Sequence, residues 1–357
     1  MPRPVITSAR PSFAARPLRI GFVALNDAAP LIVAHEHGLF RDAGLNVRLS
    51  REIGWATIRD KIVYGELDAA HSLAGLLLSL RLGLDYQPCD VLTACVLSVN
   101  GNAITLSERL WTEGVRDGAT LRDVVMKHRH ARPLTFGVVA RYSTHHVHLC
   151  DWLREAGIHP VRDVRIVVVP PGQVFRNLHA GTIDGYCVGE PWNSLAVSAG
   201  AGWCPSLSRD LSPNHPEKVL MVQSQFANER ADEHLALVAA LTRAAALCDQ
   251  PAFRPELAQL LSRREYLNVS PRIISAGLVG PFHIGHGDTD TADNLVTFHR
   301  DNANDPVPAQ GTWLIERFRR HGLIPPGSTL PRYLARDLFR TDLFRQACQR
   351  HELTSTQ

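Results

Sequence analysis

Short apolar runs alternate with helical patterns along most of the chain, and this alternation constrains the fold more than any single motif. Residues 18–25 have the pattern of a buried strand, and a helical segment follows that Pro30 opens and Gly38 ends. The same order recurs in residues 45–64, where an alternating strand pattern precedes a helix. Strands that are separated by helices pair in parallel, so the sequence predicts an α/β fold with a mostly parallel sheet.

A second series of strands and helices begins at residues 134–139, and the chain becomes more helical after residue 231. With 357 residues the chain is long enough to form two lobes rather than one. We expect a ligand cleft between two α/β lobes, because such clefts are common small-molecule sites. The expected divisions are residues 18–108 for the first part of lobe 1, 109–218 for lobe 2, and 219–357 for the return to lobe 1 and the C-terminal helices.

The bulk composition argues against binding to nucleic acid or to a membrane. Lys and Arg number 38 and Asp and Glu number 35, so the net charge is only +3. Seven scattered cysteines show no CxxC spacing, which is typical of a reducing compartment. Residues 1–17 lack the apolar segment that secretion requires, so we expect a cytoplasmic protein. The alternative is an exported protein whose signal peptide is missing from the predicted gene.

Five motifs follow one another in an order that resembles one known family. They read GWATIRDK at 54–61, GNAITLS at 101–107, VPP at 169–171, GEPWN at 189–193 and HPEKVL at 215–220. Together they resemble the nitrate/bicarbonate-binding branch of the solute-binding proteins of ABC transporters. The resemblance extends from about residue 18 to 279, and more weakly to 343. It implies the two-lobed periplasmic-binding-protein type II fold with a ligand cleft between the lobes.

The lack of an export signal narrows what this resemblance implies. Among relatives of this type, those that stay inside the cell are NasS-type nitrate/nitrite sensors. The resemblance therefore implies a sensor that binds nitrate or nitrite and thereby releases, or changes its affinity for, a NasT-type ANTAR antiterminator. Such a sensor would control genes of nitrate assimilation. The alternative is a periplasmic anion receptor of a nitrate transporter. Neither function is enzymatic, and neither implies a cofactor, a metal, a membrane or a direct nucleic-acid partner.

Nitrate is planar and singly charged, so its site needs several N–H or O–H donors and one fixed positive charge. The resemblance assigns these roles to Trp55, Asn102, Thr144, His145 and Lys218. Lys218 supplies the charge, and it stands where nitrate binders carry lysine and bicarbonate binders differ. His145 and Thr144 lie at an expected helix start, where backbone N–H groups already favour anions. Asn102 stands where exported nitrate binders carry glutamine, so the amide is one methylene shorter.

Each of these residues also has an ordinary structural explanation. Lys218 would otherwise be an exposed lysine near a turn, His145 a surface histidine and Trp55 a core residue. We expect Gly189, Glu190, Pro191 and Trp192 to shape a hinge beside the site, because an unpaired carboxylate would repel an anion.

Three further interpretations of the sequence lead to other chemistry. The histidines of residues 145–148 could hold a metal, but no acidic or cysteine partner is placed near them. Cys187 could be a nucleophile only beside a base, so we expect a core residue. An enzyme related to the thiamin-pyrimidine synthases is a third alternative, but the signature of those proteins is not recognisable here.

Overall fold

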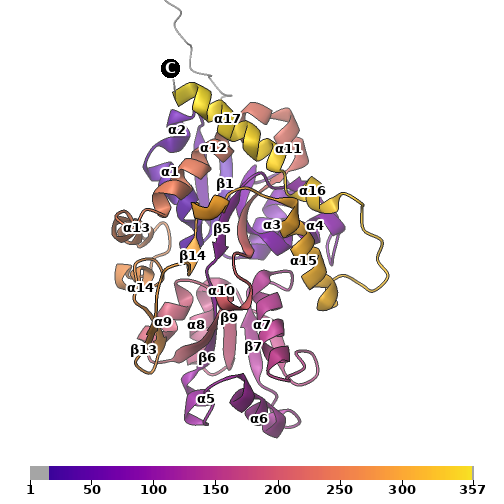
Figure 1. Ribbon diagram of the computed structural model, residues 1–357, viewed down its shortest axis with the longest axis vertical. Helices are drawn as coiled ribbons and strands as arrows, with labels where there is room; N and C mark the ends of the chain where they lie inside the picture. Colours follow the sequence, from indigo (N-terminus) through magenta and orange to yellow (C-terminus); the bar gives the residue numbers. More distant parts are fainter. Residues whose placement is uncertain (1–15, 356–357) are drawn as a thin grey trace, which may run out of the picture.

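The computed structural model describes residues 16–355, and it consists of two lobes stacked along the long axis of the molecule (Figure 1). The expectation that no export signal precedes the first strand concerns residues 1–17, nearly all of which lie outside the described residues. No helix among the described residues is long and apolar enough to cross a membrane.

The first lobe is built on a mixed sheet. Its strand order is β14 (Val296–Thr297), β5 (Val96–Asn100), β11 (Pro216–Gln223), β3 (Ala69–Leu73), β1 (Leu18–Val23) and β2 (Val47–Glu52), and β4 (Val91–Leu92) pairs with β11. The three strands β1, β2 and β3 are parallel, as the strand and helix alternation predicts. The long strand β11 runs antiparallel to both of its main neighbours, β3 and β5.

The second lobe has a sheet of five strands. Their order is β10 (Gly202–Leu207), β6 (Asn102–Ser107), β9 (Gly185–Gly189), β7 (Thr135–Val138) and β8 (Arg165–Val168). The strands β8, β7 and β9 are parallel, whereas β6 and β10 are antiparallel to their neighbours. The two-lobed α/β prediction is therefore confirmed.

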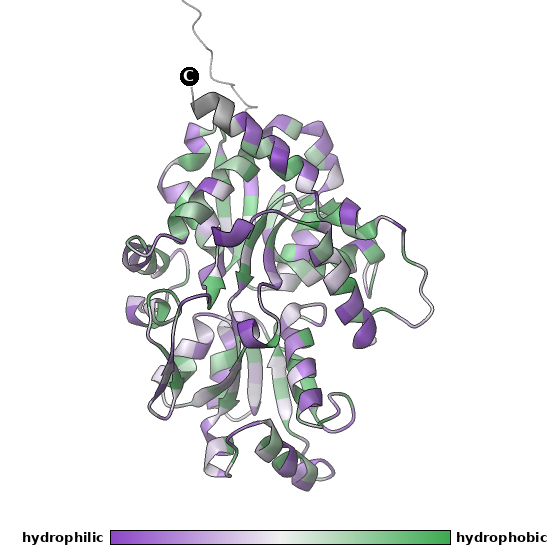
Figure 2. Cartoon of the chain, viewed as in Figure 1, coloured by the Kyte–Doolittle hydropathy of each residue, from purple (hydrophilic) through white to green (hydrophobic). Residues whose placement is uncertain are grey.

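Helices cover both sheets (Figure 1). Those of the first lobe are α1 (Ala29–Glu36), α2 (Leu39–Asp42), α3 (Trp55–Val63), α4 (Ala74–Leu82), α11 (Ser224–Glu229), α12 (Ala231–Cys248), α13 (Arg254–Leu261), α15 (Pro308–Arg320), α16 (Leu334–Leu338) and α17 (Thr341–Ser355). Those of the second lobe are α5 (Glu108–Thr112), α6 (Gly118–His128), α7 (Thr144–Glu155), α8 (Pro171–His179), α9 (Trp192–Ser198) and α10 (Ser208–Leu211). Apolar residues are frequent in the strands of both sheets (Figure 2), and apolar side chains of the strands and helices form buried clusters in each lobe.

The chain passes between the lobes earlier than the sequence suggests. It leaves the first sheet at the end of β5 and enters the second at Asn102, through Gly101, whose φ of 98° suits glycine. The expected boundary after residue 108 therefore lies one strand too late. The chain returns before β11, which starts at Pro216, so the expected boundary after residue 218 falls inside a strand of the first lobe.

The part of the chain after β11 does not stay entirely with the first lobe. A short helix α14 (Pro271–Ala276) and the hairpin of β12 (Phe282–Gly285) and β13 (Asp288–Asp290) lie against α9, and β12 also lies against β10 of the second lobe. The chain then rejoins the first sheet at β14. This segment therefore supports the junction of the lobes on one side, while α15 approaches α7 on another.

Candidate functional site

A cluster of polar side chains is buried between the lobes, and we call it the buried cluster. The first lobe contributes Asp27, Trp55, His71, Glu217 and Lys218, and the second lobe contributes Asn102, Thr144 and His145. Each of these side chains is less than a tenth exposed. All five ligand residues that the sequence predicts therefore come together at the junction of the lobes.

Lys218 lies at the centre of the buried cluster and is fully buried. Its Nζ is 2.8 Å from Oδ2 of Asp27, 2.7 Å from Oε1 of Glu217 and 5.5 Å from the centroid of the Trp55 ring. Burial alone would lower the pKa of Lys218, but the charges of the two carboxylates outweigh it and raise the pKa. Lys218 is therefore a permanently charged ammonium. The alternative explanation from the sequence, an exposed lysine near a turn, is wrong, because the side chain is fully buried.

Glu217 is the residue toward which the second lobe directs its donors. Its Oε2 accepts hydrogen bonds from Nδ2 of Asn102 at 2.7 Å and from Oγ1 of Thr144, and its Oε1 accepts from Lys218. Burial would raise the pKa of Glu217, but Lys218 overcomes this and holds it well below the ordinary value. An ionised carboxylate thus lies among the groups that the sequence assigns to nitrate.

An irregularity in β11 explains how neighbouring residues reach one site. Successive side chains of a regular strand point to opposite faces, so Glu217 and Lys218 should diverge. The pairing of β11 with β5 shifts register on both sides of Lys218. Such bulges redirect side chains, and here both residues contact the same cluster.

The start of α7 adds positive potential to the second-lobe side of the cluster. Ser143 caps the helix, since its Oγ accepts a hydrogen bond from the backbone N–H of His146 at 3.1 Å. The free N–H groups of the first turn give this end of the helix a partial positive charge beside Thr144 and His145. The expected helix start is confirmed, and it faces the cluster rather than solvent.

Two donors of the buried cluster lack a hydrogen-bond partner among the described residues. They are Nε1 of Trp55 and the ring of His145, whose Nε2 lies 3.4 Å from Oε1 of Glu217 without forming a hydrogen bond. Burial lowers the pKa of His145 to about 4, so the ring is neutral at pH 7 and has one N–H. Other buried polar atoms of the described residues are also unpaired, but these two belong to side chains that lie beside Lys218 and Glu217, where they could donate to an anion.

The sequence did not point to three members of the cluster. Asp27 lies in a short 3₁₀ helix, Asn26–Ala28, that comes after β1, and His71 lies on β3 with its Nε2 2.9 Å from Oδ1 of Asp27. Burial would raise the pKa of Asp27, but Lys218 and His71 hold it below the ordinary value. Glu217 stands next to Lys218 in the same motif, which was the available signal. With one ammonium and two carboxylates, the cluster carries one net negative charge.

The segment from Gly189 to Trp192 lies where the lobes meet. The backbone N–H of Asn26 in the first lobe donates to the carbonyl of Glu190 at 2.8 Å. A Cβ on Gly189 would lie 3.4 Å from both Oδ1 of Asn102 and Oδ2 of Asp27, so glycine leaves room for the cluster. The Glu190 side chain is buried away from the cluster cation, and burial raises its pKa to about 7.

The lobes are closed over the buried cluster. Oη of Tyr142 in the second lobe donates to Oδ2 of Asp85 in the first lobe at 2.7 Å. On α7, Asp151 forms an ion pair with Arg317 of α15 at 3.1 Å. Because the cluster is buried, a ligand from solvent reaches it only when the surrounding side chains or the lobes move.

Other sequence readings have weaker structural support. His145 and His148 are both buried, and no group of three or more His, Cys, Asp or Glu among the described residues is arranged to hold a metal ion. Cys187 lies in β9 within the core of the second lobe, where burial raises its pKa well above the ordinary value. A thiol in that state is a poor nucleophile.

Comparison with known proteins gives consistent matches over most of the chain. The NMT1-like family matches residues 14–262. The nitrate import ATP-binding protein NrtC of Synechocystis is 37% identical over 93% of this chain and 50% of its own length. The bicarbonate transport ATP-binding protein CmpC of the same organism is 37% identical over 86% of this chain and 46% of its own length. The chain thus spans about half the length of these relatives.

Two further matches extend over most of both proteins. The nitrate/nitrite binding protein NrtA of Synechococcus elongatus is 31% identical over 98% of this chain and 81% of its own length. The crystal structure of the periplasmic nitrate-binding protein NrtA of Synechocystis superposes with a TM-score of 0.89 at 29% identity. That match covers 94% of this chain and 89% of the crystallised one.

Proposed function

Because the chain belongs to the NMT1-like family, and is similar to nitrate-binding receptors of the NrtA type, we propose that it binds nitrate or nitrite in the buried cluster. Lys218 supplies the charge, and Trp55, Asn102, Thr144 and His145 supply the neutral donors. The lobes close over the anion, so the bound and free proteins differ in shape.

One observation supports this proposal above the others. Asn102, Thr144 and Lys218 donate to a single carboxylate, that of Glu217. A carboxylate and a nitrate are both planar oxyanions that accept hydrogen bonds in their plane. Donors that fit the first are therefore suited to the second, and Glu217 occupies the place that a small oxyanion would take.

When an anion binds, its negative charge has to be offset, either by a movement of the Glu217 carboxylate or by the uptake of a proton. The cluster already holds one net negative charge, and a second buried negative charge would be strongly unfavourable. Either the Glu217 carboxylate turns away from the donors, or a cluster group such as the neutral ring of His145 takes up a proton. Both responses leave the ammonium of Lys218 facing the ligand.

The similarity percentages alone do not choose between nitrate and bicarbonate, because relatives named for each are 37% identical to this chain. Lys218 favours nitrate. Nitrate and bicarbonate both carry a single charge, so this preference comes from the resemblance, in which nitrate binders have lysine at this position and bicarbonate binders differ; the charge of Lys218 is secured by Asp27 and Glu217. Bicarbonate is therefore the competitor that a binding experiment has to include.

The finer proposal is that the receptor is a NasS-type cytoplasmic sensor whose partner is a NasT-type ANTAR antiterminator. Its support is the resemblance of the motifs, together with a closure of the lobes that a partner could detect. The alternative is a receptor for a nitrate transporter, and the likeness to a periplasmic protein suits it equally. Co-purification of the chain with the antiterminator, with release on adding nitrate, would support the sensor. Recovery of the chain only from the periplasm would contradict it.

Calorimetric titration tests the ligand. Hydrogen bonds to charged groups contribute about 1.5–3 kcal/mol each, so three or four give the ~8 kcal/mol of a micromolar site. We expect heat on titration with nitrate or nitrite, and much weaker binding of bicarbonate and chloride. Absence of binding to both nitrate and nitrite would refute the proposal.

A single variant tests whether nitrate binds in the buried cluster. Trp55→Phe removes an N–H that has no partner among residues 16–355, and it keeps an aromatic ring beside Lys218. We expect little change in stability and a Kd for nitrate raised about 10- to 100-fold, the loss of one hydrogen bond to an anion. Trp203→Phe is the matched control, because its Nε1 is also buried and unpaired but lies on β10 of the second lobe. Equal affinities in the two variants would exclude Trp55 from the site.

A further inference from the structure

The strand β8 forms an open edge of the second sheet. It pairs with β7 on one side, and no other described strand pairs with it. The side chains of Val167 and Val168 are 37% and 61% exposed. Proteins usually shield such edges, because unpaired backbone groups next to apolar side chains attract another strand.

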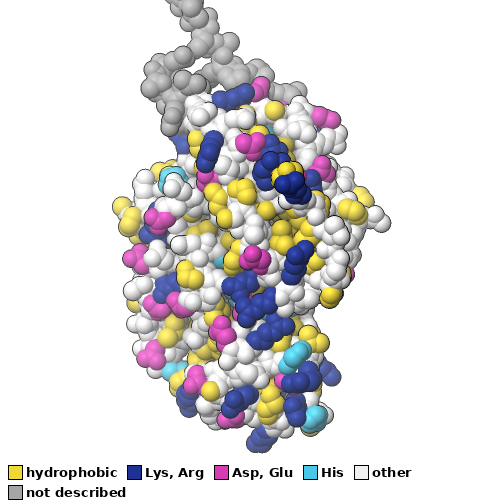
Figure 3. Space-filling model, turned by 45° about the vertical axis from the view of Figure 1, so that its right-hand side comes forward, with side chains coloured by type: hydrophobic (Ala, Val, Ile, Leu, Met, Phe, Trp, Pro, Cys, Tyr) yellow, Lys and Arg dark blue, Asp and Glu magenta, His cyan; other side chains and the backbone are white. Residues whose placement is uncertain are grey.

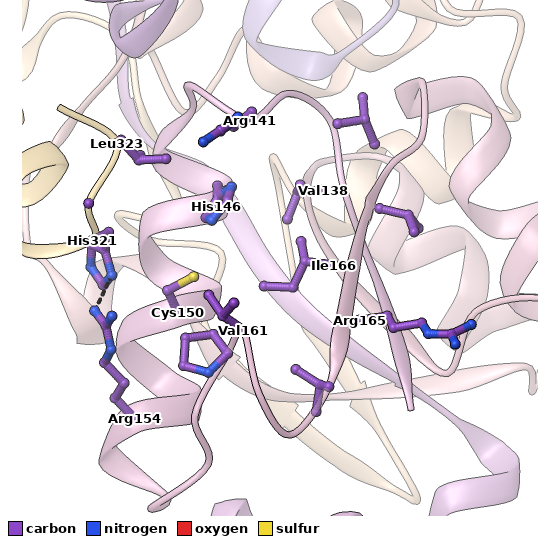
Figure 4. Close-up of a pocket in the computed structure, with 15 residues that line it drawn as sticks. Val138, Arg141, His146, Cys150, Arg154, Val161, Arg165, Ile166, His321 and Leu323 are labelled. Atoms are coloured by element: carbon purple, nitrogen blue, oxygen red, sulfur yellow. Dashed lines mark hydrogen bonds between the residues drawn. The ribbon is translucent and has the colours of Figure 1, made fainter. Parts of the chain in front are cut away.

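A hollow of about 670 Å³ follows this edge, and we call it the β8 groove (Figure 4). All five consecutive residues 164–168 line it. Because alternate residues of a strand point to opposite faces, a hollow that touches all five runs along the edge rather than over one face. Its shape therefore matches an extended segment of chain.

The backbone of β8 offers hydrogen-bonding groups to this groove. The N–H of Arg165 donates to the carbonyl of Leu134, just before β7, at 2.8 Å, and the N–H of Val169 donates to the carbonyl of Val138 in β7 at 2.9 Å. In a parallel pair every second residue bonds to the same neighbour, so the N–H and C=O groups of Ile166 and Val168 face the open edge. An added strand would pair with these groups.

The other walls of the groove come from both lobes. The second lobe contributes His146 and Cys150 on α7 and the loop that carries Val161, whose side chain is 83% exposed. The first lobe contributes residues 321–323, which follow α15. The groove is therefore complete only when α15 and α7 are in contact, as they are in the closed arrangement.

The charged residues that line the groove are all arginines. Arg141, Arg154 and Arg165 line it, and none of its 15 lining residues is Asp or Glu. No ion pair of Arg165 is found within residues 16–355, whereas Arg141 pairs with Asp85 and Arg154 contacts His321. Lys and Arg side chains also gather over the junction of the lobes in Figure 3. Carboxylates on an incoming segment would complement this charge.

We propose that the β8 groove is a docking surface for an extended, acidic segment of a protein partner, which pairs with β8 as an added strand. The main chain of β8 provides the pairing, the exposed valines provide apolar contact, and the arginines select acidic side chains. This inference does not depend on which anion the buried cluster binds.

The experiment uses the full chain and a fluorescent peptide of about seven residues in which Glu and Val alternate, with a Lys and Val peptide as its counterpart. Fluorescence anisotropy measures binding. We expect the acidic peptide to bind at least tenfold more tightly than the basic one. Equal binding of the two peptides, or binding of neither, would overturn the proposal.

Two pairs of variants test whether the peptide binds in the β8 groove. Val168→Pro removes a donor that faces the open edge and is not used in pairing with β7, and Val168→Thr keeps it. Val161→Glu adds a carboxylate at an exposed position, and Val161→Lys is its control. We expect Val168→Pro and Val161→Glu to weaken binding of the acidic peptide at least tenfold, Val168→Thr to change it little and Val161→Lys not to weaken it, with thermal melting used to verify folding. Unchanged binding in folded Val168→Pro would refute pairing at this edge.

Discussion

Glu190 is expected to make the stability of the protein fall as the pH rises, and Glu190→Gln should remove this effect. The carboxyl is 3% exposed, its Oε1 has no hydrogen-bond partner in the described chain, and a Cβ on Gly277 would lie only 2.8 Å from its Cγ. Burial, the main cause, raises its pKa from 4.5 to about 7. The folded protein therefore keeps a proton that the unfolded chain releases at lower pH.

The sign and size follow from linkage. Between pH 4.5 and about 7 the folded state binds more protons than the unfolded state, so the free energy of unfolding decreases with rising pH. Each pH unit of difference between the two pKa values corresponds to about 1.36 kcal/mol, so the full loss above pH 7 is about 3 kcal/mol. Below pH 4.5 the carboxyl is neutral in both states, so this loss of stability is absent.

Urea unfolding of the two proteins between pH 4.5 and 8.5 measures this difference. Glutamine resembles the neutral carboxyl in shape, so Glu190→Gln should be more stable than the parent by about 3 kcal/mol at pH 8 and nearly equal to it at pH 4.5. Buried histidines such as His145 and His234, with pKa values lowered to about 4, destabilise both proteins equally as the pH falls. A constant difference across the pH range would refute the reasoning.

Three further predictions concern closure and charge. Gly75→Ala places a Cβ 2.7 Å from the carbonyl oxygen of Tyr142 across the junction, so it should raise the Kd for nitrate about tenfold. Gly21→Ala, whose Cβ would meet Leu67 within the first lobe, should lower the melting temperature without that change in affinity. Asp151→Asn removes ion pairs between α7 and α15, so it should weaken nitrate binding several-fold, less so at high salt. Nitrate binding should take up protons, seen as a binding heat that changes with the ionisation enthalpy of the buffer; a buffer-independent heat would show that Glu217 turns away instead.

The sequence predicted the strands and helices well where apolar periodicity is local and clear. Residues 18–25 and 145–156 correspond to β1 and α7 within a few positions. The predicted ligand residues come together because their motifs lie at the ends of strands or the starts of helices that meet at the junction. Gly101 shows the limit, because residues 100–102 read Asn-Gly-Asn, a turn signal that does not reveal whether the next strand joins the same sheet or the sheet of the other lobe.

The electrostatics of the cluster could not be predicted from local patterns. Asp27 and Lys218 are 191 residues apart in the sequence, and no periodicity relates them. Glu217 should point away from Lys218 in a regular strand, and only the register shift in β11 brings it into the cluster. An internal carboxylate in place of the expected ligand is thus a property of tertiary packing.

The length of α7 gives it a mechanical role. Its 12 residues span about 18 Å, from Thr144 in the buried cluster to Glu155 beyond the β8 groove. A stiff rod of that length converts a tilt of about 5° into a displacement of about 1.5 Å at its far end. A small adjustment around an anion bound as proposed would thereby become larger at Arg154 and Glu155, which are half-buried and exposed. With the anion bound as proposed, α7 would carry a small movement at its start to a larger one at its end.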